Sequence, residues 1–277
     1  MVTVIDLTNR ALAPLFDLMC WPFLALSPIW AMTAISLVSG IVMVWVFGKV
    51  SDQDTIKQIR EQIRGNLIGV RLFQSDISVV LRLQRRIFGD TFRYMRYALV
   101  PMVVLLVPVV LIMTQLNLRF AVRPLEPGEP ALVKAYVRDA TVLDGEVGLD
   151  VPDGVTVETQ GVRIPSTREV AWRVRVDASG EHQMKVRIGG QELETRLMAG
   201  GQWGAVPQRR TGRGMLDTLL YPGEPPIPSD HLVEAVEIVY PPLELGVFGW
   251  SINWLFAFFV LSMAFGFAFK GVMGVEV

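Results

Sequence analysis

The chain has 277 residues, of which 51% are hydrophobic and 19% charged, with a mean hydropathy of +0.40 and a net charge of −1. This composition is too apolar for an ordinary soluble chain of this length, so we expect part of the protein to lie in lipid. The lone cysteine, Cys20, excludes an intrachain disulfide and a cysteine-rich metal cluster, and only His182 and His231 could contribute histidine ligands. The sequence therefore predicts no cofactor and no metal.

Residues 1–27 carry an amphipathic pattern. Three apolar residues recur at four-residue spacing, away from the charged side chains: Leu7, Ala11 and Leu15. This pattern is typical of a short interfacial helix, which Pro14 would kink, and a frayed terminus is the alternative. No basic region precedes the next apolar stretch and no small-residue cleavage pattern follows it, so we expect that stretch to remain in the protein and not to be removed as a signal peptide.

A charge-free window at 28–48 predicts the first transmembrane helix, because about 20 apolar residues in a helix cross a bilayer. Ser36 and Gly40 lie four residues apart in this window. Small residues at that spacing allow close packing of one helix against another, within the chain or between chains.

The segment 49–96 contains no proline, and its apolar residues recur at intervals of three and four, close to a coiled-coil period. Capping residues at 74–76 interrupt the pattern, so we expect a helical hairpin or a kinked helix that runs into the next span. Five arginines are candidates for contact with anionic lipid headgroups or with a partner: Arg82, Arg85, Arg86, Arg93 and Arg96. The candidate partners are nascent chains, ribosomal RNA or an acidic protein, although no motif for a specific nucleic acid is present.

A second charge-free window, 97–118, predicts transmembrane helix two. Thr114 and Gln115 are neutral polar residues near its end, and we expect them to line a shallow groove.

Residues 119–244 begin with a turn-rich stretch and then alternate apolar and polar residues. The alternation predicts strands at 131–138, 155–159, 170–176, 184–188, 193–197 and 233–240. Gly189-Gly190 supplies a two-residue turn, and Trp172 is expected in the core. Short strands at this spacing predict an antiparallel β-sandwich with an immunoglobulin-like plan.

The third charge-free window predicts transmembrane helix three at 245–269, followed by a tail at 270–277. Ser262 and Gly266 repeat the small-residue spacing of the first helix, and Asn253 is a further candidate for the polar lining of a groove. The fold class is therefore that of an α+β membrane protein with three transmembrane helices.

Charge sets the expected orientation, because short basic loops stay in the cytoplasm. The segment 49–96 contains ten basic and five acidic side chains, whereas 119–244 contains fourteen basic and nineteen acidic ones. We therefore expect the first segment in the cytoplasm and the β domain outside, with the amino terminus outside and the carboxyl terminus inside. The expected location is a bacterial-type cytoplasmic membrane.

The usual catalytic motifs are missing from the sequence. It contains no GxSxG elbow, HExxH, paired CxxC or GxGxxG. None of the three windows holds an ionisable residue of the kind that marks an ion or proton path. We therefore expect no catalytic residues and no enzyme activity.

The stretch from Ile56 to Gln115 includes Arg96-Tyr-Ala-Leu-Val-Pro101 and a proline-containing second helix with Pro108. In organisation it resembles the coiled coil and following helix of YidC-type membrane insertases and their archaeal and endoplasmic-reticulum relatives. The resemblance implies an insertase that brings nascent membrane proteins into lipid. Helix one lacks the basic residue of bacterial members, and the β domain replaces a short connection.

Two functions are favoured at this stage, and an enzymatic or sensory role for the β domain is a further alternative. The first is a non-catalytic membrane subunit that scaffolds, stabilises or assembles a larger complex with other membrane protein subunits. The alternative is a YidC-like insertase or chaperone for membrane-protein biogenesis.

Overall fold

The computed structural model describes residues 2–212, 215–247 and 249–273. The chain divides into two compact units. The sandwich unit comprises Met1–Met32 and Leu111–Ala257, and the helical unit comprises Thr33–Val110 and Phe258–Val277. Helices together with antiparallel sheets confirm the expected α+β class.

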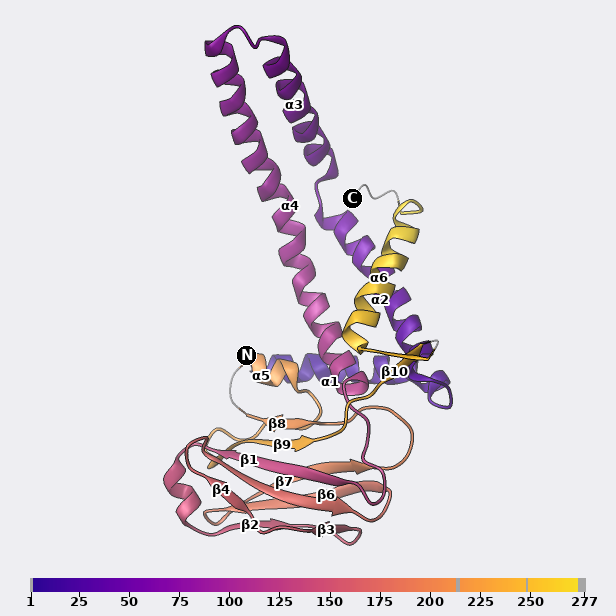
Figure 1. Ribbon diagram of the computed structural model, residues 1–277, viewed down its shortest axis with the longest axis vertical. Helices are drawn as coiled ribbons and strands as arrows, with labels where there is room; N and C mark the ends of the chain where they lie inside the picture. Colours follow the sequence, from indigo (N-terminus) through magenta and orange to yellow (C-terminus); the bar gives the residue numbers. More distant parts are fainter. Residues whose placement is uncertain (1, 213–214, 248, 274–277) are drawn as a thin grey trace. The chain divides into compact units, whose positions relative to one another are not determined.

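Nine strands build the sandwich: β1 (Pro130–Val137), β2 (Val147–Asp150), β3 (Val155–Val157), β4 (Val162–Ile164), β5 (Glu169–Val176), β6 (Gly180–Ile188), β7 (Gln191–Ala199), β8 (Arg209–Thr211) and β9 (Val233–Val239). One sheet has the order β3-β5-β1-β9-β8, with β4 also paired to β5, and the other has the order β2-β6-β7 (Figure 1). All pairings in these two sheets are antiparallel. Every strand expected from alternation is present, and the immunoglobulin-like plan stays a prediction.

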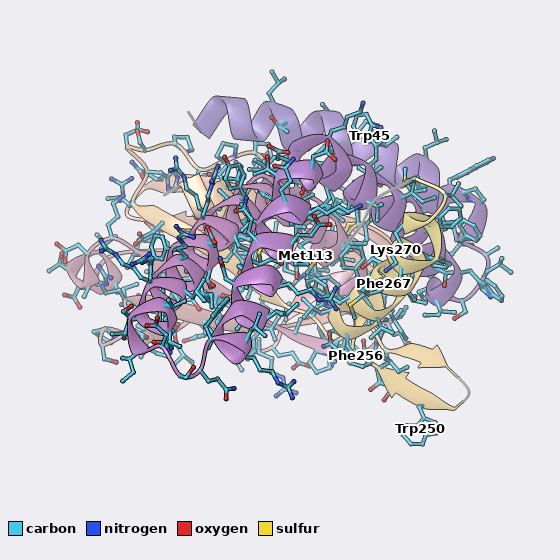
Figure 2. All side chains as sticks on the ribbon, turned by 90° about the horizontal axis from the view of Figure 1, so that it is seen from above. Trp45, Met113, Trp250, Phe256, Phe267 and Lys270 are labelled. Carbon is cyan, nitrogen blue, oxygen red and sulfur yellow. The ribbon has the colours of Figure 1, made fainter. Side chains whose placement is uncertain are left out.

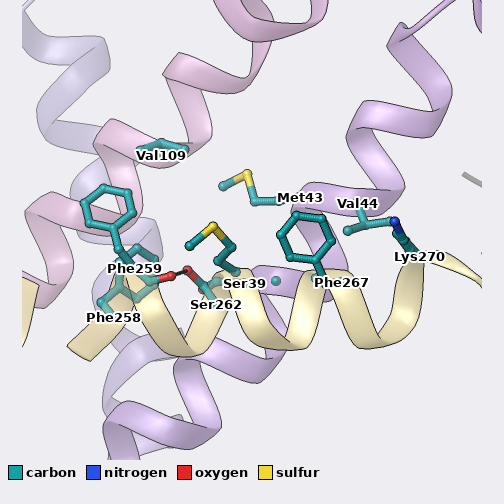
Figure 3. A pocket seen from close by; sticks show the side chains of 12 residues that line it. Ser39, Met43, Val44, Val109, Phe258, Phe259, Ser262, Phe267 and Lys270 are labelled. Carbon is teal, nitrogen blue, oxygen red and sulfur yellow. Dashed lines mark hydrogen bonds between the residues drawn. The ribbon is translucent and has the colours of Figure 1, made fainter. Parts of the chain in front are cut away.

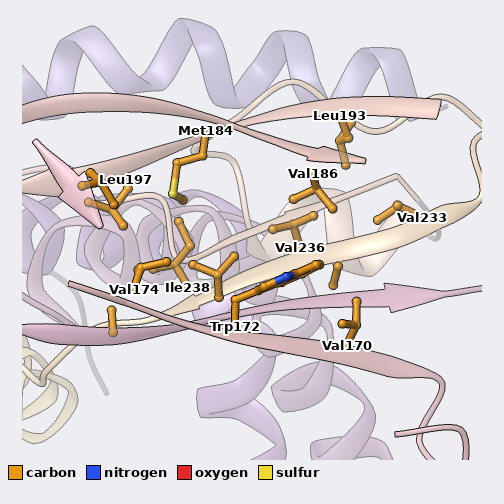
Figure 4. Packing of buried hydrophobic residues seen from close by; sticks show 14 of the residues in the cluster. Val170, Trp172, Val174, Met184, Val186, Leu193, Leu197, Val233, Val236 and Ile238 are labelled. Carbon is orange, nitrogen blue, oxygen red and sulfur yellow. The ribbon is translucent and has the colours of Figure 1, made fainter. Parts of the chain in front are cut away.

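The sandwich core lies between the two sheets, because alternate side chains of each strand point inward. On β5, Trp172 and Val174 are buried while Arg173 between them is exposed. Figure 4 shows these two buried residues facing Met184 and Leu197 of the other sheet. The expectation that Trp172 is a core residue is confirmed.

The tight turn between β6 and β7 has the expected two residues. Gly189 and Gly190 have φ angles of 58° and 78°, and Ile188 pairs directly with Gln191. Two successive positive φ angles define the hairpin turn that matches strand twist, and glycine adopts them without steric cost.

Strand β7 lies at the edge of its sheet, where unpaired backbone groups would invite another strand. Two of its N–H groups instead donate hydrogen bonds to side chains. The N–H of Arg196 donates to the carboxylate of Glu224 at 2.6 Å, and the N–H of Met198 donates to the hydroxyl of Tyr240 at 3.0 Å. Burial raises the pKa of Tyr240, so its hydroxyl stays neutral.

The helices and remaining elements are α1 (Val2–Cys20), η1 (Trp21–Phe23), α2 (Pro28–Val50), α3 (Gln53–Leu72), α4 (Ile77–Phe120), η2 (Ala140–Asp144), α5 (Met215–Leu220), β10 (Leu245–Val247), β11 (Trp250–Ile252) and α6 (Trp254–Lys270). A helix, not a frayed end, occupies residues 2–20, and it continues through Pro14. By length and composition, α2 and α4 could each cross a membrane, whereas α6 is a shorter apolar helix.

Helices α3 and α4 form a hairpin in the helical unit (Figure 1). Asp76 caps the start of α4 by accepting from the N–H groups of Ser78 and Val79. The hydrogen bond from the Ser78 hydroxyl, followed by the one from the Val79 N–H, lowers the pKa of Asp76. Across the hairpin, Asn66 donates to Asp90 at 3.2 Å. The break expected at 74–76 is therefore present.

The prediction of a helix throughout 245–269 is wrong. Strands β10 and β11 pair as a hairpin, with Gly249 at a φ of 83° in the turn, and α6 begins only at Trp254. Figure 2 shows Trp250 projecting from this hairpin. Hydropathy alone missed the turn, because every residue of the hairpin is uncharged. Of the predicted tail at 270–277, residues 274–277 lie outside the described residues.

An ion pair stabilises the turn that precedes β1, where the chain enters the sandwich. Arg123 donates from its two terminal nitrogens to both carboxylate oxygens of Glu129, at 2.9 and 2.8 Å, and the N–H of Glu126 also donates to that carboxylate. The guanidinium and this N–H together lower the pKa of Glu129 to about 2. The pair holds the turn before β1 closed.

We predict that Glu129→Gln lowers the free energy of unfolding by about 1 kcal/mol at neutral pH, since the pair is partly exposed and screened. A lowered carboxyl pKa stabilises the fold above the unfolded value of 4.5, and this contribution disappears as the pH falls towards about 2. Thermal unfolding of the full chain in detergent, followed by circular dichroism, measures the difference. Glu126→Gln is the control, because its side chain is 73% exposed and 3.7 Å from Arg123. Equal losses in both variants, or a difference that persists at low pH, would contradict the assignment.

Candidate functional site

The sandwich unit buries one arginine near the end of α4. The Arg119 side chain is 1% exposed, and its five N–H donors are matched by five hydrogen bonds. Two of these bonds go to Asp17 of α1, at 2.6 and 3.0 Å, and one goes to the carbonyl of Ala13. The other two go to the backbone and side-chain oxygens of Gln115. The guanidinium also lies 5.7 Å from the ring centre of Phe16.

Asn9 extends this network. The amide of Gln115 lies within hydrogen-bond reach of the backbone and side-chain oxygens of Asn9, at 3.4 and 3.5 Å. Asn9 in turn donates towards the carbonyls of Thr218 and Leu219 in α5. Helix α1 is thus joined by buried polar contacts to α4 and to α5.

The opposite face of α1 is apolar and exposed. Leu7, Leu15 and Leu18 are each more than half exposed, and so is Trp21 just after the helix. Because Asn9 and Phe16 are buried in the sandwich unit, the leucine face points away from that unit. Helix α1 thus buries Asn9, Phe16 and Cys20 and exposes a leucine face, and this exposed apolar face suits a helix that lies at a membrane surface.

The helical unit contains an apolar cavity of about 310 Å³. Its walls come from α2, α6 and Val109 of α4 (Figure 3). Ser39, Ser262 and Lys270 are its polar residues, and the hydroxyl of Ser262 donates to the carbonyl of Phe259 in its own helix. The ammonium of Lys270 lies 5.2 Å from the centre of the Phe267 ring. The cavity can accommodate an apolar group.

Close packing of α2 and α6 borders this cavity. A Cβ added to Gly40 would lie 2.6 Å from the carbonyl oxygen of Ser262 and 3.2 Å from the nitrogen of Gly266. The structure thus brings together Gly40, Ser262 and Gly266, three of the four predicted helix-packing residues. The fourth, Ser36, is buried, and its hydroxyl has no hydrogen-bond partner among the described residues.

The predicted groove residues are separated. Gln115 is fully buried in the Arg119 network, and Thr114 beside it is buried with a hydroxyl that lacks a partner among the described residues. Asn253 caps α6, because its side-chain oxygen accepts from the N–H of Leu255 at 2.9 Å. The five predicted contact arginines, at 82, 85, 86, 93 and 96, are all exposed on α4.

Sequence reasoning missed the Arg119 network. Arg119 directly follows the charge-free window of helix two, and Asp17 precedes that of helix one, so each looks like an ordinary flanking charge. The pairing joins residues 102 positions apart, which no local pattern reveals. The signal present in the sequence was that two charge-free windows are flanked by residues of opposite charge, Asp17 and Arg119, which can pair.

Comparisons with known proteins add no family. No protein-family model matches the chain, and no curated protein matches it significantly. A solved structure that matches is the crystal structure of domains 4 and 5 of the S-layer protein SbsC, with 15% identity and a TM-score of 0.21. The match covers 28% of this chain and 47% of that one, and at this score it supports no argument.

We predict that Gly40→Ala destabilises the protein by about 1–3 kcal/mol, because the added methyl group must push α2 and α6 apart. The control is Gly65→Ala on α3, where the added Cβ meets nothing within 4 Å. That change should stabilise the helix by about 0.5–1 kcal/mol. Thermal unfolding of both variants in detergent measures the effect, and shifts of the same sign would contradict the close contact.

We predict strong coupling between Asp17 and Arg119. Asp17→Ala leaves a buried guanidinium without its counter-charge and should cost about 2 kcal/mol, less than a fully buried pair because Asp17 is 60% exposed. In an Arg119→Leu background the same change should cost almost nothing. Unfolding of the two single variants and the double variant completes the cycle. Additive losses would show that the ion pair does not hold α1.

Proposed function

We propose that this protein is a non-catalytic integral membrane subunit that binds another membrane protein and stabilises or assembles a larger complex. The observation that carries the proposal is the exposure of α4. Only 11% of its most apolar 18-residue window is buried within the chain. Side chains such as Val103 and Val107 therefore require lipid or a partner helix around them.

Two prolines strengthen the case for a partner helix. Pro101 and Pro108 lie inside α4 and have no N–H, so the carbonyls of Tyr97 and Val104 lose their usual helical donors. A carbonyl in hydrocarbon without a donor is costly, and neighbouring helices commonly supply one in membrane proteins. A partner helix with a hydroxyl or amide side chain against this face of α4 donates the missing hydrogen bond to these carbonyls.

The proposed topology has three spans, α2, α4 and α6. Helix α6 has 17 residues, about 26 Å, slightly short of a hydrocarbon core of about 30 Å. Trp250 and the β10–β11 hairpin then lie at the outer interface beside it. The sandwich and α1 lie outside and the α3–α4 hairpin lies in the cytoplasm of a bacterial-type cell, as the basic charge of 49–96 favours.

The polar groups favour a subunit over an insertase. Passage of polar segments needs a wet, polar groove, whereas the cavity of the helical unit has mainly apolar walls. Gln115 and Asn253 already serve the Arg119 network and the cap of α6. The observation in favour of an insertase is the pair of buried hydroxyls, of Ser36 and Thr114, that have no partner among the described residues.

The test is photocrosslinking in cells. With benzoylphenylalanine at Val103 or Val107, we expect an adduct of discrete mass with one membrane protein, identified by mass spectrometry. The same probe at Val162, exposed on β4 of the sandwich, is the control and should not give that adduct. Adducts with lipid alone, together with a lone monomer after mild extraction, would refute the proposal.

The insertase alternative makes a separate prediction. Probes at Ser36, Thr114 and Asn253 should then form adducts with ribosome-stalled nascent membrane proteins. Silence at all three positions would remove this alternative and leave the subunit proposal intact.

A further inference from the structure

One face of α4 before the proposed span is apolar and exposed. Ile77, Leu81, Phe88 and Phe92 recur at intervals of four, seven and four residues, so they share a helix face. Their side chains are between 60% and 76% exposed. We call these four residues the apolar row. Leu83, which approaches Gly69 of α3, lies on a different face, so the hairpin does not cover the row.

Arginines accompany the apolar row. Arg82, Arg85 and Arg86 lie between Leu81 and Phe88 in sequence, and all three are exposed. The surrounding segment 49–96 has twice as many basic as acidic side chains. Arg85 lies four residues after Leu81 and three before Phe88, so it borders the apolar row, whereas Arg86 lies on the opposite side of the helix. An exposed apolar row bordered by an arginine, in a segment of net positive charge, is the surface that an amphipathic helix with an acidic flank would complement.

We propose that the apolar row binds an acidic amphipathic helix of a partner protein on the cytoplasmic side. The inference rests on the proposed span of α4, which places the hairpin in water. The partner's apolar stripe covers Phe88 and Phe92, and its carboxylates pair with the guanidinium group of Arg85, which borders the row.

The bilayer is a poor alternative occupant. Helix α4 is continuous, so the row continues along its axis away from the span. At 1.5 Å per residue, Ile77, Leu81 and Phe88 lie about 30, 24 and 14 Å from position 97, beyond a headgroup layer that is only about 5–8 Å thick on each side. Phe92, at about 8 Å, lies at the edge of that layer. Arg93 and Arg96 lie within about one turn of the span and are the arginines that can reach headgroups.

A second copy of this chain is also disfavoured. Two hairpins side by side would bring together two segments that each carry ten basic and five acidic side chains. Like charges at a helix interface repel, whereas carboxylates on a different protein are attracted.

Peptide binding to the full chain in nanodiscs of neutral lipid tests the proposal. The probe is a labelled 21-residue helical peptide with leucines at coiled-coil a and d positions and glutamates on the flanks, compared with the same peptide carrying lysines. By fluorescence anisotropy we expect the acidic peptide to bind at least about tenfold more tightly. Phe88→Ser/Phe92→Ser should weaken it by about tenfold or more, and Arg85→Gln should weaken it and reduce its salt dependence.

The control variant is Val162→Ser, which removes an exposed apolar residue from the sandwich and should leave binding unchanged. Equal affinity for the two peptides, or full affinity after the phenylalanine changes, would overturn the proposal. A mixed-sequence RNA 20-mer that binds and competes with the acidic peptide would overturn it in favour of RNA.

Photocrosslinking at Phe88 identifies the natural occupant. We expect an adduct whose crosslinked fragment is an acidic amphipathic helix. An adduct with lipid, RNA or a second copy of the chain, or none at all, would overturn this inference. The subunit proposal is tested with probes at Val103 and Val107, whereas this inference is tested with a probe at Phe88. Either proposal can therefore fail without the other.

Discussion

The position of α1 in the sandwich unit depends on the burial of one charged group, the guanidinium of Arg119. A fixed positive charge taken out of water must have its donors satisfied and an anion nearby. Helix α1 supplies the anion, Asp17, and together with the carbonyl of Ala13 it accepts three of the five hydrogen bonds. Once α1 is held there, its leucine face has to point outward, because a helix cannot bury two opposite faces against one surface. The partial exposure of Asp17 keeps water on the anion, so the pair avoids the full cost of desolvation.

Much of the fold is local and was therefore predictable. The alternation in β5, the two glycines of the β6–β7 turn and the capping group of Asp76 each act over a few residues, and each has its effect where the pattern places it. Helix α2 follows from its uncharged window for the same reason. These elements need no distant partner to specify them.

The remainder depends on distant contacts or on conformations that hydropathy does not register. The β10–β11 hairpin carries no charge, so hydropathy does not distinguish it from a span. The positive φ of Gly249 lies in its turn, and the cap from Asn253 begins α6. Gln115 was expected in a groove because it is a polar residue in an apolar window, yet its oxygen accepts from a buried guanidinium that follows one helical turn later. In an apolar helix, a polar side chain can form a structural hydrogen bond within the protein as readily as it can contact solvent or a substrate.

The exposed apolar surface of α4 favours different environments in the two halves of the helix. Around Val103 the helix lacks charged neighbours, so lipid or a buried partner helix can surround it without desolvating an ion. Around Phe88 the neighbours include arginines, which hydrocarbon would penalise and carboxylates would stabilise. The same degree of exposure thus favours an apolar environment in one half of the helix and an acidic protein surface in the other. The arginines, and not the apolar residues, decide between the two.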